Sequence, residues 1–208
     1  MREFATAFGT VIVANGTFPK HEVPLGILRN ACHVVACDGA VIHCPQAEVV
    51  IGDGDSAPEA FRDRLIQMTE QEDNDLTKAT RYCLSRGWHR IAYIGTTGKR
   101  EDHTLGNISL LMRYYRDMGI EGIIFTDYGY FTPAQGNHTF QSQPGQQVSI
   151  FNFGCTAITS DGLKWDSYAY RELWQGTLNQ ALTDRFTLHA DGYYMVYQTY
   201  EDKDGDRG

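Results

Sequence analysis

The first 126 residues alternate short apolar runs with segments of helical periodicity, and each run stops at a glycine, aspartate, asparagine or threonine. Strands that are apolar throughout and alternate with helices are typical of a parallel sheet covered by helices on both faces. The pattern predicts strands over residues 10–14, 31–37, 48–51, 90–94 and 122–126. The helical stripes predict helices over residues 24–30, 57–68, 76–85 and 105–118.

The pattern changes near residue 130. Glycine, proline and glutamine then separate short alternating segments, and helical periodicity disappears. This is typical of an antiparallel sandwich or barrel. Strands are expected over residues 147–153, 156–159, 185–190 and 193–200. The sequence therefore predicts an N-terminal α/β domain over residues 1–130 and a β domain over residues 131–208.

The composition narrows the classes of partner. The formal net charge is −8, and Lys and Arg are scattered, so neither a nucleic acid nor an anionic membrane is expected as a partner. No stretch approaches the roughly 20 apolar residues of a membrane span, and the N-terminus lacks a secretory signal pattern. Five cysteines without a CxxC pair favour reduced thiols in the core over a disulfide framework or a zinc site. We expect a cytoplasmic protein.

Polar residues gather where the predicted parallel strands end. In such sheets, ligands bind beyond the carboxyl ends of the strands. Asn15, Asp38, Asp53, Asp55 and the loop at 95–102 should therefore converge on one crevice.

Two aspartates one residue apart, Asp53 and Asp55, follow the third strand. Gly54 between them lets both carboxylates face one point, as Mg²⁺ binding requires. The alternative is a solvated loop in which Asp55 and Ser56 cap the helix expected over 57–68.

A second acidic group at 72–75 opens the next predicted helix. Three acids at a helix start could simply complement the helix dipole. Lys78 lies one turn beyond Asp75 on the same face, where it could pair with that carboxylate or touch a phosphate.

The segment GTTGKREDH at 95–103 reads as a strand end, a glycine-bearing loop and a helix start. Its amides suit a phosphate, and Lys99 or Arg100 could neutralise charge on it. Asp102 could be a capping residue, or it could accept the proton of a substrate hydroxyl.

Taken together, these motifs resemble the thiamine pyrophosphokinase family. The resemblance rests on DGA at 38–40, IGDGDS at 51–56, QEDNDLTK at 71–78, GTTGKREDHTLGN at 95–107 and GLKW at 162–165. It implies transfer of a pyrophosphoryl group from ATP to the hydroxyethyl oxygen of thiamine, giving thiamine diphosphate and AMP. It also implies a C-terminal β-sandwich and a homodimer with active sites at the subunit interface.

The resemblance also assigns roles to residues. The Mg²⁺ ligands would be Asp53, Asp55 and Asp75. The catalytic residues would be Asp102, Arg100 and Lys78, with Asp102, Trp165 and Asn179 binding thiamine. The ATP-binding residues would be Asn15, Asp38, Gly39, Gln71, Gly95, Thr96, Thr97, Gly98 and Asn107.

Two other functions stay open at this point. Glu72, Asn74 and Leu178 stand where the family usually has Asp, Thr and Ser. These differences would suit a nucleotide or thiamine sensor that keeps the fold without the reaction. The same chemistry on another primary alcohol is the other alternative.

Overall fold

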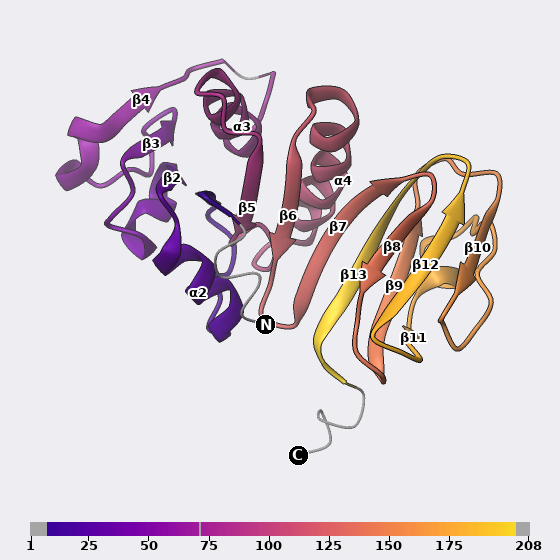
Figure 1. Cartoon of the computed structure of the whole chain (residues 1–208). Helices are drawn as coiled ribbons and strands as arrows, with labels where there is room; N and C mark the ends of the chain where they lie inside the picture. Colours follow the sequence, from indigo (N-terminus) through magenta and orange to yellow (C-terminus); the bar gives the residue numbers. More distant parts are fainter. Residues whose placement is uncertain (1–7, 71, 203–208) are drawn as a thin grey trace. The chain divides into compact units, whose positions relative to one another are not determined.

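The computed structural model describes residues 8–70 and 72–202. The chain divides into two compact units, Met1–Asp127 and Tyr128–Gly208, which are described one at a time (Figure 1).

The first unit is built on a parallel sheet with the strand order β6-β5-β1-β2-β3-β4. Its strands are β1 (Thr10–Val13), β2 (His33–Cys37), β3 (Val49–Gly52), β4 (Leu65–Gln67), β5 (Arg90–Ile94) and β6 (Glu121–Phe125). The five predicted strands are confirmed, and β4 was not predicted. The central strands are almost wholly buried, which explains why they read as unbroken apolar runs.

Three α-helices accompany this sheet: α2 (Glu22–Asn30), α3 (Asp75–Ser85) and α4 (Glu101–Met118). The Asn74 side chain accepts a hydrogen bond from the backbone N–H of Thr77 and so caps α3, while Gly119 ends α4 in the left-handed conformation. α3 packs against β1, β2 and β3, and α4 packs against β6.

Buried hydroxyl groups join α3 to β5 and α4. The hydroxyl groups of Thr77 and Tyr114 lie 2.7 Å apart, and those of Thr80 and Tyr93 lie 3.1 Å apart. The two tyrosine rings stack with centroids 5.8 Å apart. Both helices that begin beside the predicted site therefore rest on one hydrogen-bonded support.

The helix predicted over 57–68 is wrong. Residues Glu59–Arg64 form the short 3₁₀-helix η2 and bury no side chain, and the next three residues form β4. Leu65 and Ile66 pair with Val50 and Ile51 of β3, so backbone pairing with the sheet edge replaces a helix. The proposed capping role of Ser56 is also wrong, because η2 is preceded by Pro58 and has no side-chain cap. The Ser56 backbone N–H donates to the carboxylate of Asp38.

The second unit consists of two antiparallel sheets, β11-β9-β13-β7 and β10-β12-β8. Their strands are β7 (Gly129–Gln135), β8 (His138–Gln141), β9 (Gln146–Asn152), β10 (Ile158–Asp161), β11 (Asn179–Gln180), β12 (Arg185–Ala190) and β13 (Tyr193–Asp202). Ile150 and Val196 from the first sheet share one core with Phe140 and Phe186 from the second. This packing confirms the predicted sandwich, although β7, β8 and β11 were not foreseen.

The cysteines follow the prediction with one exception. All five are free thiols, and four of them are buried, but Cys32 is exposed rather than part of the core. Burial raises the pKa of the Cys44 and Cys83 thiols to about 12, which keeps both protonated.

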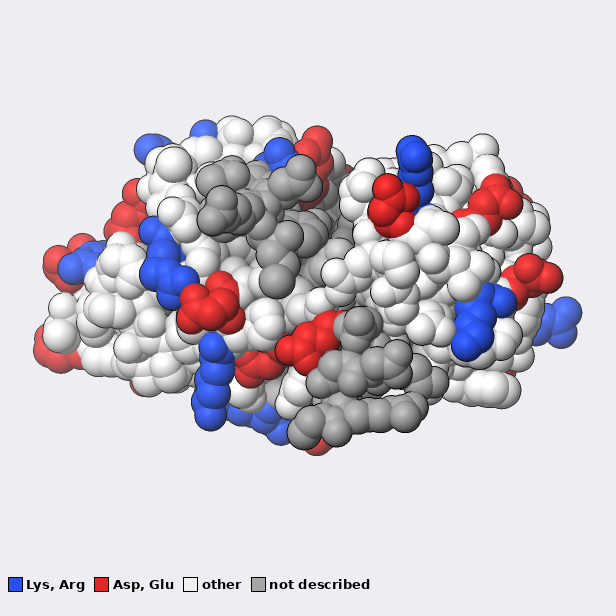
Figure 2. All heavy atoms as spheres, turned by 60° about the horizontal axis from the view of Figure 1, so that its bottom comes forward, with Lys and Arg blue, Asp and Glu red and all other residues white. Residues whose placement is uncertain are grey.

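Charged side chains are dispersed on the face shown in Figure 2. They lie singly or beside a residue of opposite sign, with uncharged surface between them. Among the described helices, none has the length and apolar character needed to cross a bilayer.

Candidate functional site

In the sheet of the first unit, the order in which strands are added reverses at β1 and β5. From β1 the chain adds β2, β3 and β4 on one side, whereas β5 and β6 lie on the other. The backbone N–H groups of Gly16 and Thr17, just after β1, donate to the carbonyls of Gly95 and Thr97 at 2.7 and 2.8 Å. A Cβ atom at position 16 would collide with both carbonyl oxygens. The two loops therefore meet at the switch point where such sheets bind ligands.

The loop at 95–99, here called the glycine loop, presents a fixed cation. Gly95, Gly98 and Lys99 all have positive φ, and the value of 60° for Lys99 is uncommon for a residue with a side chain. Its ammonium donates to the backbone and side-chain oxygens of Asn15 at 2.9 and 3.1 Å. This bridge holds the charge of Lys99 over the switch point.

Two further side chains border the glycine loop. Asn107 on α4 donates to the carbonyl of Thr96 at 2.7 Å, and its side-chain oxygen accepts from Asn74 at 3.3 Å. The Thr96 hydroxyl is buried and has no hydrogen-bond partner among the described residues. The loop is thus tied to the starts of α3 and α4.

Four carboxylates form what we call the acidic cluster: Asp38 after β2, Asp53 and Asp55 after β3, and Asp75 at the start of α3. The Asp55 N–H donates to the Asp53 carboxylate at 3.1 Å, which folds the loop after β3 into a tight turn around Gly54. Asp75 begins α3. Burial raises the pKa of Asp75, and the charges of Asp38 and Asp53 raise it further, while Lys78 opposes the shift. Asp75 therefore interacts electrostatically with Asp38 and Asp53, as carboxylates that share a cation do.

Lys78 is a buried partner of this cluster, with 4% of its side chain exposed. Its ammonium donates to the Met68 carbonyl at 3.0 Å and to Asp75 at 3.3 Å. Of the two predicted alternatives, the structure shows the pairing with Asp75.

The cluster fits a magnesium ion that keeps much of its water. In the described parts of the chain, no three His, Cys, Asp or Glu side chains are arranged to hold one ion together. Mg²⁺ is commonly held by one or two carboxylates plus waters and substrate phosphates. One oxygen of Asp38 is buried without a hydrogen-bond partner in the described structure, and burial, with the charges of Asp38 and Asp53, raises the pKa of Asp75. Both features are relieved by a cation.

Asp102 lies in the first turn of α4, opposite the glycine loop. Arg100 donates to both of its oxygens, at 3.1 and 2.6 Å, and the His103 N–H donates to it at 2.9 Å. The hydrogen bonds from Arg100 lower the pKa of Asp102 to about 2. The carboxylate is exposed, so it is ionised and accessible to a ligand at neutral pH.

The loop before α3 holds a residue that the sequence did not single out. Asp73 pairs with Arg113 of α4 at 3.1 Å and with Arg81 of α3 at 3.3 Å. It therefore fastens the loop that carries Asp75 to both helices. Gln71, a predicted ATP ligand, lies outside the described residues, and Glu72 is exposed.

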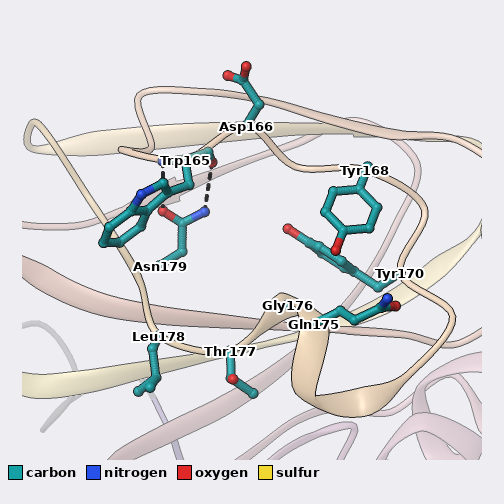
Figure 3. Close-up of a pocket in the computed structure, with 9 residues that line it drawn as sticks. All are labelled: Trp165, Asp166, Tyr168, Tyr170, Gln175, Gly176, Thr177, Leu178 and Asn179. Carbon is teal, nitrogen blue, oxygen red and sulfur yellow. Dashed lines mark hydrogen bonds between the residues drawn. The ribbon is translucent and has the colours of Figure 1, made fainter.

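A pocket of about 260 Å³ lies in the second unit and includes both predicted thiamine residues, Trp165 and Asn179 (Figure 3). The side-chain amide of Asn179 accepts from the Trp165 N–H at 3.2 Å and donates to its carbonyl at 2.8 Å, which fixes the backbone of Trp165. The pocket is lined by Trp165, Asp166, Tyr168, Tyr170, Gln175, Gly176, Thr177, Leu178 and Asn179.

The aromatic residues of the pocket differ in their exposure. Tyr170 is buried, whereas Trp165 and Tyr168 are about half exposed, at 48% and 52%. The rings of Tyr168 and Tyr170 meet edge to face at 4.6 Å. In Figure 3 the Asp166 carboxylate points away from the other lining side chains. Aromatic faces open to solvent can accept a cationic or planar ligand.

Comparison with known proteins shows two protein-family models that match the chain. The thiamin pyrophosphokinase catalytic domain matches residues 26–121, and the thiamin pyrophosphokinase substrate-binding domain matches residues 129–197. A sequence search of curated proteins gave no match.

Solved thiamin pyrophosphokinases share the fold at low sequence identity. The Bacillus subtilis protein has a TM-score of 0.74 and 18% identity, covering 91% of this chain and 98% of that one. The Candida albicans protein has a TM-score of 0.78 and 13% identity, covering 95% and 91%. The yeast protein has a TM-score of 0.77 and 14% identity, covering 96% and 89%. Since the two family matches are the catalytic and substrate-binding parts of one enzyme and together span most of the chain, the chain belongs to the thiamin pyrophosphokinase family.

Proposed function

We propose that this enzyme transfers the pyrophosphoryl group of ATP to the hydroxyethyl oxygen of thiamine in a Mg²⁺-dependent reaction, giving thiamine diphosphate and AMP. The observation that carries the proposal is that the acidic cluster follows β2 and β3 while the glycine loop follows β5, so both lie at the carboxyl ends of strands of one parallel sheet. A cation site beside amide donors and a lysine suits a polyphosphate.

In this proposal Asp53, Asp55 and Asp75 hold the metal, and Lys78 is a positioning residue that orients Asp75. Bound Mg²⁺ would neutralise the ATP phosphates and help to align them. The amides of the glycine loop and the ammonium of Lys99 would bind the same phosphates from the side of β5. Asn15, Gly39 and Asn107 would shape the nucleotide site around them.

Asp102 would accept a hydrogen bond from the thiamine hydroxyl. Its low pKa makes it a weak base, so its main contribution is to orient the oxygen toward the β-phosphorus. The new bond joins that oxygen to the β-phosphorus, the bond from the β-phosphorus to the bridging oxygen of AMP breaks, and the hydroxyl proton is released. Arg100 keeps Asp102 ionised and in place.

The pocket of the second unit would hold the thiamine rings. Thiamine is cationic, and the face of Trp165 is a suitable contact for it. We propose domains at 1–130 for ATP and Mg²⁺ and at 131–208 for thiamine and dimerisation, in a homodimer whose active sites lie at the subunit interface. Free thiols suit a cytoplasmic enzyme.

The test is to incubate the purified protein with thiamine, ATP and Mg²⁺ and to resolve the products by chromatography. Thiamine diphosphate and AMP in equal amounts are expected, with none after EDTA treatment. ADP or thiamine monophosphate would overturn the position of attack. Calorimetric binding of both ligands without AMP would indicate a sensor, and faster turnover of another primary alcohol would reassign the acceptor.

A further inference from the structure

Asp38 combines a strained backbone conformation with a buried carboxylate. It follows β2 directly, is 6% exposed, and has φ of 42°, a left-handed conformation that few residues with side chains adopt. One carboxylate oxygen, Oδ2, accepts the Ser56 N–H at 3.0 Å. The other, Oδ1, is buried and has no hydrogen-bond partner among residues 8–70 and 72–202. An unsatisfied buried carboxylate oxygen destabilises the fold unless something else binds it.

The Asp38 side chain lies against both ends of the turn that carries Asp53 and Asp55. Gly52 lies against the Asp38 side chain so closely that a Cβ atom there would come within 2.8 Å of the Asp38 Cβ. Ser56 is the residue that follows Asp55 in the turn after β3. Asp75 lies within electrostatic range of the Asp38 charge, so no anion or acceptor would satisfy the oxygen. A hydrated cation would.

Resting on the proposed Mg²⁺-dependent function, we propose that Asp38 is a fourth carboxylate of the metal site, whose free Oδ1 binds Mg²⁺ directly or through a metal-bound water. The strained backbone is then the means of placing this oxygen. Asp53 and Asp55 on the next strand supply the other carboxylates on that side, and Asp75 supplies one from α3.

The alternative is that Asp38 serves only the turn, through its hydrogen bond with Ser56. Asp38→Asn separates the two roles. Asparagine tolerates positive φ and can still accept the Ser56 N–H, but it removes the charge and one of the two carboxylate oxygens. The matched control is Asp117→Asn, which makes the same change at an exposed residue near the other end of α4.

Mn²⁺, which prefers similar oxygen ligands, is titrated into each protein with and without a non-hydrolysable ATP analogue, and free Mn²⁺ is measured by electron paramagnetic resonance. We expect Asp38→Asn to weaken Mn²⁺ binding at least about tenfold, with the control unchanged. The metal-free melting temperature of Asp38→Asn should equal or exceed that of wild type, because an unsatisfied buried charge is gone.

Equal Mn²⁺ affinity in wild type and Asp38→Asn would overturn the proposal, as would a wild type that binds no Mn²⁺ under either condition. A metal-free melting temperature lower by more than about 4 °C would show that the carboxylate is kept for the fold. AMP release by the wild type is measured separately, so failure of the Asp38 proposal is distinguishable from failure of the proposed function.

Discussion

The two candidate sites are built in opposite ways. The edge of the first unit consists of buried or hydrogen-bonded polar groups on short loops, and two of its residues, Asp38 and Lys99, have positive φ. The pocket of the second unit is lined mainly by residues of the longer connection between β10 and β11, where the rings of Trp165 and Tyr168 are about half exposed and that of Tyr170 is buried. Groups that stabilise charge developing in a reaction need fixed positions. Aromatic rings that bind a ligand by surface contact can shift slightly and still make that contact. Substitutions at the edge should therefore lower turnover, and substitutions in the pocket should weaken acceptor binding.

The largest effect is expected for Asp53→Asn. Asp53 would act through the cation that it holds, and losing one group that stabilises developing negative charge typically costs about 100- to 1000-fold in kcat. We expect a loss of that size with unchanged thiamine binding and unchanged circular dichroism. Asp63→Asn, at an exposed position of η2, is the control and should keep full activity. Near-normal turnover of Asp53→Asn would remove Asp53 from the metal site.

Asp102→Asn should lower kcat by about 100-fold, because the neutral amide is a weaker hydrogen-bond acceptor for the alcohol and orients its oxygen poorly. The neighbouring Glu101→Gln is a matched control on the same helical turn. The Asp102 pKa of about 2 predicts that this group causes no acid limb in the activity profile above pH 3. An acid limb that disappears in Asp102→Asn would contradict that assignment.

In the pocket, Trp165→Ala should raise the KM for thiamine about tenfold, since a desolvated cation–aromatic contact is worth roughly 1–2 kcal/mol. The KM for ATP should not change. Trp174→Ala is the control, because Trp174 is 72% exposed and is not among the pocket residues. A rise in both KM values would mean that the two regions do not divide the substrates as proposed.

The pH dependence of stability offers a smaller effect. The raised pKa of Asp75 means that the metal-free folded protein binds its proton more tightly than the unfolded chain does. This contribution is complete below the ordinary carboxyl pKa of about 3.9 and is lost as the pH rises through the raised value. Urea unfolding in EDTA should show that loss in wild type and not in Asp75→Asn. A parallel pH profile for the two proteins would exclude it.

The smallest effect should come from Leu178→Gly. Leu178 has φ of 63° and is 68% exposed, so its conformation costs roughly 1 kcal/mol without much burial in return. Glycine should raise the free energy of unfolding by up to about that amount. Leu182→Gly, exposed but without positive φ, should give no gain. A loss of stability in Leu178→Gly would show that the leucine makes a contact important to the pocket.

Sequence patterns predicted the parts of this molecule that depend on neighbours along the chain. Five strands of the first unit and the helices over 76–85 and 105–118 follow from local spacing. The helix over 57–68 failed because pairing with β3 decided the structure there. The apolar spacing within residues 57–68 does not show that this segment pairs with the edge strand β3.

Contacts between distant residues were beyond such patterns. Asp73 meets Arg113 forty residues further on, and Ser56 meets Asp38 across two strand ends. Likewise, Trp165 and Tyr170 look alike as aromatic residues of the β domain, but one is half exposed and the other is buried. Which side chain faces a ligand is decided by the packing of the whole unit.

The close approach at Gly16 has a consequence for engineering this enzyme. A saturation library at position 16 should return only glycine among folded clones, because even a methyl group meets two backbone oxygens that cannot move without separating β1 from β5. Gly106, on the exposed side of α4, has open space around its Cβ position and should accept alanine. At position 16, the tolerance of this edge of the sheet to redesign is therefore set by backbone spacing rather than by side-chain chemistry.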